Sequence, residues 1–161
     1  VLRWEAKAPL CAVTRIEGNT MINKKGSANW KGSLKDGTGT VSTESGVLDK
    51  ENYGFNKRFE GEAGTNPEEL IAASHASCFS MALSMVLGDA GFTAEAISTE
   101  ATVSLEKQDG GFAVTKSHLV VTAKIPNATA EDFAKAAATA KENCPISKLL
   151  TAEITMDATL A

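Results

Sequence analysis

A long uncharged segment, residues 70–87, constrains this chain more than any other feature of its sequence. The segment contains no Asp, Glu, Lys or Arg, and apolar or small side chains fall on every face of the helix it would form. Asn66 can cap that helix, Pro67 suits its first position because the missing N–H would be unpaired there, and Gly88 and Gly91 stop it. A helix without a polar face has to be enclosed by protein, so we predict a buried central helix. Its length also approaches that of a membrane span, but its histidine and serines favour burial in protein, and we expect no membrane partner.

Two β-hairpins are predicted from residues that alternate in polarity on either side of a turn. Residues 26–34 alternate, reach an Asp36-Gly37 turn and continue into residues 38–44. Residues 97–105 and 112–125 alternate in the same way around a second Asp-Gly turn. Because an alternation with period two places one face of a strand on a core, both pairs predict antiparallel strands.

The remaining segments complete the pattern of helices and strands. Residues 53–59 alternate aromatic and polar side chains before a glycine-bounded stretch at 61–64, which predicts a loop or a short edge strand. Residues 129–142 begin with a threonine cap and carry an apolar face, which predicts a helix, and a proline opens a short helical turn over residues 145–150. Residues 152–160 alternate again as a closing strand. Strands that flank segregated helices predict an α+β fold with antiparallel sheets.

The length and charge of the chain indicate one soluble domain. With 161 residues the chain can bury one core, and its formal net charge of −4 argues against nucleic acid or an anionic membrane as a partner. We predict a single domain over residues 21–161 and an extension over residues 1–20, of upstream or artificial origin or else an arm against a partner. The first residues lack the features of a secretory signal, which predicts a cytoplasmic protein. The three cysteines, with Cys11 in the extension, do not make a disulfide framework.

Two thiols lie at helix positions of chemical interest. Cys78 lies within the long segment, where a free cysteine is more often a core residue than a catalyst unless a positive neighbour stabilises its thiolate. His75, three residues earlier on the same face, is the one such neighbour within a turn. Cys144 precedes Pro145 at the predicted start of a short helix, where the helix dipole favours an anion, although such pairs often only mark a helix boundary. A zinc site that joined these residues with His118 stays an alternative, but no CxxC or HxxxH pair supports it.

Five separated blocks of the sequence carry a family resemblance. They cover residues 40–48, 53–61, 64–71, 75–82 and 142–145, and they read TVSTESGVL, YGFNKRFEG, GTNPEELI, HASCFSMA and ENCP. In this order the blocks resemble the OsmC/Ohr family of thiol peroxidases, and the first two are similar to its OsmC branch. The resemblance implies an OsmC-like fold, with antiparallel sheets wrapped around a long buried central helix in an intertwined homodimer. It also implies reduction of organic hydroperoxides, and of hydrogen peroxide as a further substrate, in oxidative or osmotic stress defence.

The resemblance also implies roles for four residues in these blocks. Cys78 matches the peroxidatic cysteine, and Cys144 matches the resolving cysteine. Arg58 matches the arginine that activates the thiolate, and Glu68 matches the carboxylate that orients this arginine. Lys57 departs from the branch, which usually has threonine at that position. The family implies a dithiol reductant such as dihydrolipoamide on a lipoylated protein, and we expect no cofactor or metal because the sequence has no metal, haem or flavin motif.

The spacing of these residues poses a geometric problem. Ten helical residues separate Glu68 from Cys78, which corresponds to about 15 Å along a straight helix and about 80° around its axis. Either Arg58 spans much of this gap, or the helix breaks after its first turn, or the groups come from different subunits. We expect composite sites at a homodimer interface, because a helix that is apolar on all sides also needs more cover than one small sheet provides.

Two functions remain open for these thiols. A peroxidase would form a sulfenic acid on Cys78 and then a disulfide with Cys144, and the permanent charge of Arg58 would favour the thiolate. The alternative is a small-molecule binding or sensing module on the same fold, with structural cysteines, because a fold does not dictate a function. The two differ in the reactivity of Cys78, since only the peroxidase needs a reactive thiol.

Overall fold

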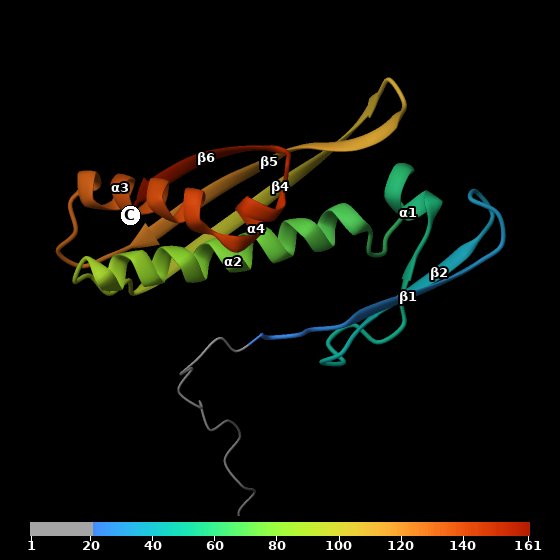
Figure 1. The fold of residues 1–161 in the computed structure, drawn as a ribbon, viewed down its shortest axis with the longest axis horizontal. Coiled ribbons are helices and arrows are strands. Elements are labelled where there is room, and N and C mark those ends of the chain that lie inside the picture. Colours follow the sequence, from blue (N-terminus) through green and yellow to red (C-terminus); the bar gives the residue numbers. More distant parts are fainter. Residues whose placement is uncertain (1–20) are drawn as a thin grey trace, which may run out of the picture.

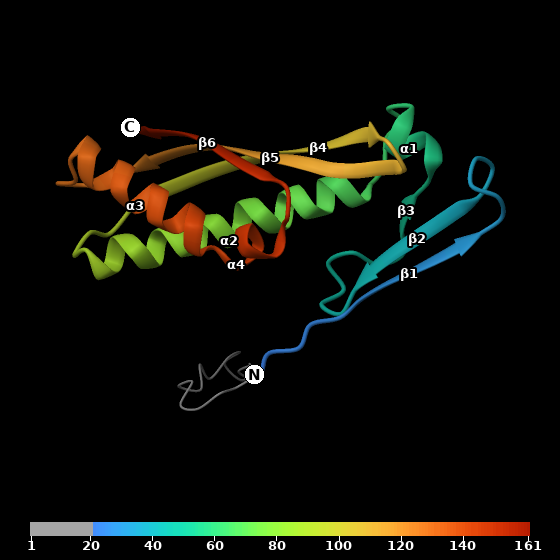
Figure 2. The same cartoon turned by 45° about the horizontal axis from the view of Figure 1, so that its top comes forward.

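The computed structural model describes residues 21–161, which form two three-stranded sheets and four helices (Figure 1). The expectations for residues 1–20, including Cys11, lie outside the described residues. The second sheet and three helices form one body, and the first sheet projects from the amino-terminal end of the longest helix (Figure 2). The arrangement is α+β, as the sequence predicts.

The first sheet is an antiparallel hairpin with a short edge strand. Strand β1 (Gly26–Lys31) pairs with β2 (Thr38–Thr43), and β2 pairs with β3 (Glu51–Tyr53). This confirms the hairpin predicted from the Asp36-Gly37 turn, whereas strand β3 was not predicted. Every residue of β1 is exposed, although Trp30 packs beside Tyr53, so the described part of the chain leaves most of this strand uncovered.

The residues that follow β3 form a helix, which was not predicted. Helix α1 (Phe55–Phe59) begins after Gly54. Phe55 and Phe59 are four residues apart, and their ring centroids lie 4.8 Å from each other on one side of the helix. The aromatic spacing that suggested alternation is therefore that of a helical pair over residues 55–59, whereas residues 61–64 form the predicted loop.

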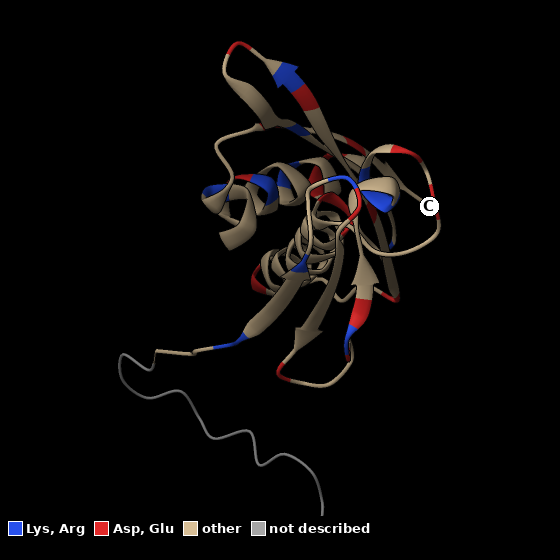
Figure 3. Ribbon diagram, turned by 90° about the vertical axis from the view of Figure 1, so that its right-hand side faces the viewer, with Lys and Arg blue, Asp and Glu red and all other residues tan. Residues whose placement is uncertain are grey.

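The long helix α2 (Pro67–Asp89) begins where the sequence predicts. The Asn66 side chain accepts a hydrogen bond from the backbone N–H of Glu69 at 2.9 Å, which satisfies one of the free donors of the first turn. Beyond this first turn the helix carries no Lys, Arg, Asp or Glu until Asp89 (Figure 3). The cap, the proline and the uncharged run therefore place this helix correctly.

Only one face of α2 is buried by residues 21–161. Phe79, Leu83 and Leu87 are fully buried in the core, whereas Met81 and Met85 on the opposite face are 75% and 61% exposed. The expectation of a helix enclosed on all sides is thus met on one side only by this chain. By length and composition α2 could cross a bilayer, but strands and helices of this chain pack against its buried face.

The second sheet contains one predicted hairpin and one parallel pair. Strands β4 (Ala96–Gln108) and β5 (Gly111–Lys124) pair antiparallel as predicted, around the second Asp-Gly turn. Strand β6 (Glu153–Leu160) pairs with β5 in parallel, whereas we expected antiparallel sheets. Two helices between β5 and β6 return the chain to Lys116 within β5, where β6 begins, and such a crossover is the connection that parallel strands require.

These two helices meet at a cysteine. Helix α3 (Ala130–Asn143) starts with the predicted cap, in which the Thr129 hydroxyl accepts from the Asp132 N–H at 3.1 Å and the Asp132 carboxylate accepts in return. Helix α4 (Pro145–Leu149) follows directly, as predicted. Cys144 is both the last cap of α3 and the first cap of α4, so its backbone marks a sharp change of direction beside α2.

Candidate active site

The two predicted thiols lie next to each other where α4 packs on α2. Cys78 is a half-buried residue of α2, and Cys144 is fully buried at the joint between α3 and α4. Cys78 packs against the core cluster that contains Cys144, and the Cys144 side chain is near enough to raise the pKa of the Cys78 thiol. Both thiols are free. The fold therefore brings together two thiols that are far apart in the sequence.

The surroundings of Cys78 in this chain do not favour its thiolate. Burial raises the pKa of the Cys78 thiol, because the charged form is disfavoured out of water. The backbone N–H of Ile146, in the first turn of α4, donates a hydrogen bond that lowers this pKa, and the Cys144 side chain raises it again. The net shift is upward, so the described residues around Cys78 do not supply the cation that a reactive thiolate needs.

His75 lies one turn before Cys78 but does not supply this charge. Its Nδ1 atom is 2.8 Å from the Ser117 hydroxyl on β5, and its Nε2 atom is 2.9 Å from the Ser147 hydroxyl on α4. The ring is fully buried, and burial lowers the pKa of His75, so the imidazole is neutral near neutral pH. His75 is therefore not the positive neighbour that the sequence suggested.

His118 lies on the face of the second sheet that points away from the helices. Its Nδ1 atom is 2.6 Å from the Thr155 hydroxyl, and its Nε2 atom is 3.4 Å from the Asp157 carboxylate. Successive residues of a strand point to opposite faces, so His118 and its neighbour Ser117 face opposite sides of β5. This placement contradicts a zinc site shared with the thiols, and residues 21–161 contain no group of three or more His, Cys, Asp or Glu side chains that could hold a metal ion.

The predicted pair of Arg58 and Glu68 forms within the chain. The Arg58 Nε donates to Glu68 Oε2 at 3.0 Å, and Nη2 donates to Oε1 at 2.5 Å, which is the forked geometry of a strong ion pair. Hydrogen bonding to Glu68 raises the pKa of Arg58, so the guanidinium stays charged. The guanidinium carbon also lies 5.2 Å from the centroid of the Phe59 ring. Helix α1 and the first turn of α2 together fix this cation.

The ion pair is distant from the thiols of the same chain. Helix α2 runs without a break from Pro67 to Asp89, so Glu68 and Cys78 are about 15 Å apart along it. A helix that breaks after its first turn is thereby excluded. Arg58 is not among the groups that shift the pKa of Cys78. The chain thus holds a thiol half of the predicted site, Cys78 with Cys144, and a separate cation half, Arg58 with Glu68.

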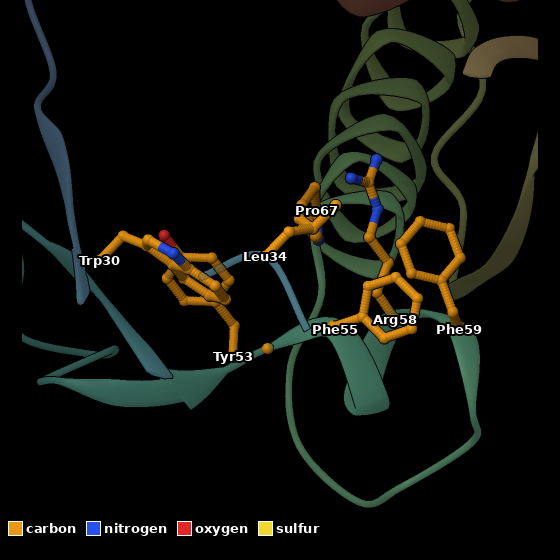
Figure 4. Close-up of a pocket in the computed structure, with 8 residues that line it drawn as sticks. Trp30, Leu34, Tyr53, Phe55, Arg58, Phe59 and Pro67 are labelled. Atoms are coloured by element: carbon orange, nitrogen blue, oxygen red, sulfur yellow. The ribbon is translucent and has the colours of Figure 1, made fainter. Parts of the chain in front are cut away.

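An apolar pocket opens beside the cation half (Figure 4). It has a volume of about 320 Å³ and lies between the β1–β2 hairpin, α1 and the start of α2. Its lining consists of Trp30, Leu34, Tyr53, Gly54, Phe55, Arg58, Phe59 and Pro67. The pocket therefore combines an apolar wall with a single charged side chain, and the Cys78 of the same chain is not part of it.

One close contact in the first sheet shapes this wall. Trp30 lies opposite Gly39 in the β1–β2 pair, and the Trp30 and Tyr53 ring centroids are 5.5 Å apart. A Cβ atom on Gly39 would lie 2.5 Å from the Tyr53 ring, so the two rings can cross this position only because it is glycine. The sequence prediction missed this wall, although a tryptophan in an exposed hairpin opposite a glycine is a signal that could have found it.

Lys57, the residue that departs from the family pattern, has a structural partner. Its Nζ atom donates to the backbone carbonyl of Ala63 at 2.8 Å and pairs with the Glu62 carboxylate at 3.3 Å. These bonds tie down the loop between α1 and α2. Lys57 does not line the pocket, so the departure leaves the cation half intact.

Comparisons with known proteins extend over most of the chain. Residues 59–159 match the family model described as OsmC-like protein. The peroxiredoxin OsmC of Escherichia coli (strain K12) is 59% identical over 136 residues, which cover 84% of this chain and 95% of that protein. The organic hydroperoxide resistance protein OhrB of Bacillus subtilis (strain 168) is 33% identical over 111 residues, which cover 68% of this chain and 79% of that protein.

The fold comparison agrees with the sequence comparison. The crystal structure of OhrB of Bacillus subtilis superposes with a TM-score of 0.64 at 30% sequence identity, covering 85% of this chain and 98% of that chain. Both the OsmC and the Ohr relatives align, with the higher identity on the OsmC side. The chain therefore belongs to the family of OsmC-like proteins, as the resemblance of its five sequence blocks implied.

Proposed function

We propose that this chain is a thiol peroxidase that reduces organic hydroperoxides, with Cys78 as the attacking residue and Cys144 as the residue that resolves its oxidised form. The observation that carries the proposal is the packing of Cys78 against the cluster that contains Cys144, in a chain of the OsmC-like family. Relatives named for peroxiredoxin activity and for organic hydroperoxide resistance support the same reaction.

The reaction uses the two sulfurs and one hydroperoxide. The Cys78 thiolate attacks the distal peroxide oxygen, the O–O bond breaks, and the sulfur becomes a sulfenic acid while the alkoxide takes up a proton and leaves as an alcohol. The Cys144 sulfur then attacks the sulfenic sulfur, an S–S bond forms, and the hydroxyl leaves as water with the thiol proton. A dithiol reduces this disulfide and returns both thiols.

We infer that two copies of the chain complete each site. The cation half and the thiol half are about 15 Å apart along one α2, so Arg58 of one subunit would serve Cys78 of its partner. The exposed Met81 and Met85 face of α2 and the uncovered β1 strand are the surfaces that a second copy would bury. In such an intertwined homodimer the first sheet of one subunit lies against the α2 of the other.

The pocket beside Arg58 supports an organic hydroperoxide as the substrate. Its aromatic and aliphatic wall fits an apolar tail, and the Arg58 guanidinium donates to the polar peroxide end. Hydrogen peroxide has no tail, so it would use the guanidinium without the wall and react less efficiently. The dithiol reductant we propose is dihydrolipoamide on a lipoylated protein, and the reaction belongs to the cytoplasm, where thiols are kept reduced.

Replacing each thiol separately tests the proposal. Cys78→Ser should abolish turnover of cumene hydroperoxide, because no nucleophile remains. Cys144→Ser should still consume one equivalent and form a sulfenic acid on Cys78, but it should not turn over with a dithiol. Consumption of hydroperoxide is followed in stopped flow, and mass analysis identifies the sulfenic acid or disulfide. Full activity of Cys78→Ser would contradict the proposal.

The raised pKa of Cys78 within one chain favours a second candidate, a small-molecule binding module with packing cysteines. Thiol titration of the native protein separates the two candidates. The binding module requires a Cys78 pKa at or above the ordinary value of about 8.5, whereas the peroxidase requires a lower one and the loss of two thiols per hydroperoxide.

A further inference from the structure

The thiol half of the site has a second connection between the same two helices. His75 precedes Cys78 by three residues on α2, and Ser147 follows Cys144 by three residues on α4. The His75 Nε2 to Ser147 Oγ distance of 2.9 Å therefore joins the two helices one turn away from the place where the thiols meet. The two contacts therefore lie next to each other between α2 and α4, and we call the bond from His75 to Ser147 the rung.

We propose that His75 is a positioning residue that holds Cys144 beside Cys78 while the disulfide forms. The proposal rests on the proposed function of the two cysteines. The proposal adds one claim to that function. The bond from His75 to Ser147, rather than the contact between the thiols, sets the position of α4.

Helix α4 needs such an anchor because it cannot hold its own position. A single helical turn of this length has little stability of its own, and no side chain caps its start. Ser147 is the buried residue of α4, and its hydroxyl bonds to the imidazole. Without this bond α4 would be held on α2 by apolar contacts and by groups around the reacting Cys78 sulfur, which changes during the reaction.

The other side of the imidazole is fixed as well. The His75 Nδ1 atom is 2.8 Å from the Ser117 hydroxyl on β5, so the ring is held between the sheet and α4. A neutral imidazole has one donor and one acceptor nitrogen, and two hydroxyls can serve both. Because the ring is fully buried and burial lowers the pKa of His75, this pairing is kept at neutral pH.

The rung matters most in the second chemical step. When the Cys78 sulfur carries a hydroxyl, its contact with Cys144 is changed, and the new S–S bond needs the two Cα atoms within a narrow range of distance. The rung from His75 to Ser147 contains no reacting atom, so it is unchanged during this step. It therefore keeps α4 in place while water leaves and the disulfide closes.

Matched serine variants separate this role from general stability. Ser147→Ala removes the rung to α4, and Ser117→Ala removes the equivalent hydroxyl on the sheet side of the same ring. Reduced protein is mixed with cumene hydroperoxide, quenched at set times, and analysed by mass for thiol, sulfenic acid and disulfide. We expect Ser147→Ala to slow disulfide formation about three- to tenfold, the range of one net hydrogen bond, without slowing sulfenic acid formation. Sulfinic acid should accumulate in excess hydroperoxide.

Variants of His75, on α2, test the same hydrogen bond from its other partner. A Gln side chain reaches the position of the imidazole Nε2, and an Asn side chain reaches that of Nδ1. His75→Gln should therefore keep the wild-type rate of disulfide formation, and His75→Asn should slow it as Ser147→Ala does. Ser147→Thr, which keeps the hydroxyl, should behave like the wild type.

Three outcomes distinguish the alternatives. An unchanged disulfide rate in both Ser147→Ala and His75→Asn would overturn the positioning role. Equal slowing by Ser117→Ala and Ser147→Ala would overturn it too, because the effect would then be one of packing around the ring. If the wild type itself formed no disulfide, the proposed function would fail instead.

Discussion

Two neighbouring cations on α1, Lys57 and Arg58, have different partners although they are adjacent in the sequence. Lys57 bonds to the loop at Ala63, whereas Arg58 forms the forked pair with Glu68 and lines the apolar pocket. Only Arg58 has the planar group with several donors that can hold a carboxylate and still face a ligand. The two residues form a natural pair for separating the effect of charge from that of position.

Arg58→Met should lower the rate of Cys78 oxidation at pH 7 by at least about tenfold. An opposite charge next to a thiol shifts its pKa by about one to three units, so losing that charge lowers the thiolate fraction by a similar power of ten. The pH dependence of Cys78 alkylation by iodoacetamide measures the pKa directly. Lys57→Met is the control and should leave the pH profile of alkylation unchanged. An unchanged profile in Arg58→Met would show that Arg58 does not act on Cys78.

The residues that could be predicted are those with distinctive chemistry. Cys78 and Cys144 drew attention as thiols at helix positions, but their roles, like those of Arg58 and Glu68, were predicted from the family blocks and stay predictions. Ser147 was not found, because a serine carries no signal of burial until the fold shows it bonded to an imidazole. Its place two residues after Pro145, in the turn that follows the thiol, is the one sequence clue.

At the scale of elements, the first turn of α2 contains both the residue that caps the helix and the carboxylate that holds Arg58. Asn66 caps the helix, and Glu68, two residues later, holds Arg58. A helix end that frays would release this carboxylate and with it the guanidinium. The stability of one helical turn therefore affects the geometry of the ion pair.

Asn66→Ala should lower the free energy of unfolding by about 1 kcal/mol, the usual loss when a capping side chain is removed. Asn66→Asp keeps an acceptor at the same place and should remain close to the wild type. Urea titration at a fixed protein concentration measures both. A loss of similar size in the two variants would show that the hydrogen bond to Glu69 is not what stabilises the turn.

Elements with strong local signals could be predicted, and those set by distant contacts could not. The cap of α3 and the hairpin of β4 and β5 follow from Thr129 and the Asp109-Gly110 turn. The direction of β6 relative to β5 does not follow from alternation, since the same pattern fits a parallel or an antiparallel partner. Helix α1 was missed because a spacing of four between Phe55 and Phe59 also fits an alternating strand.

At the scale of the whole molecule, the described chain leaves two kinds of surface uncovered. The first sheet projects away from the main body, with β1 exposed throughout, and α2 presents Met81 and Met85 outward (Figure 2). The sequence predicts an enclosed helix, and this chain encloses only half of it. The uncovered surfaces and the distance between Arg58 and Cys78 are both what the proposed homodimer would explain.

Mixing two variants that each lack one residue of the site tests whether each site is shared between subunits. Chains with Cys78→Ser retain Arg58, and chains with Arg58→Met retain Cys78. If the two residues of a site come from different subunits, a mixed dimer contains one intact site. Denaturing the variants together and refolding them should then restore about a quarter of the wild-type activity, because about half of the dimers are mixed and each has one intact site of two.

The control is to refold each variant alone, which should give only the residual activity of that variant. Light scattering should show a mass of about twice the 16.8 kDa of one chain in every sample. Recovery no greater than the sum of the separate samples, in verified mixed dimers, would place both residues of a site in the same subunit.

The parallel pairing of β5 and β6 has a consequence for how Cys144 competes with other thiols. The connection over residues 125–152 is joined to the same sheet at both ends, which together with the bond from His75 to Ser147 limits how far Cys144 can move from α2. Groups held in a fixed orientation react as though present at about 10⁵ M or more, far above any dissolved thiol. An oxidised Cys78 therefore meets the thiol of its own chain before it meets one from solution.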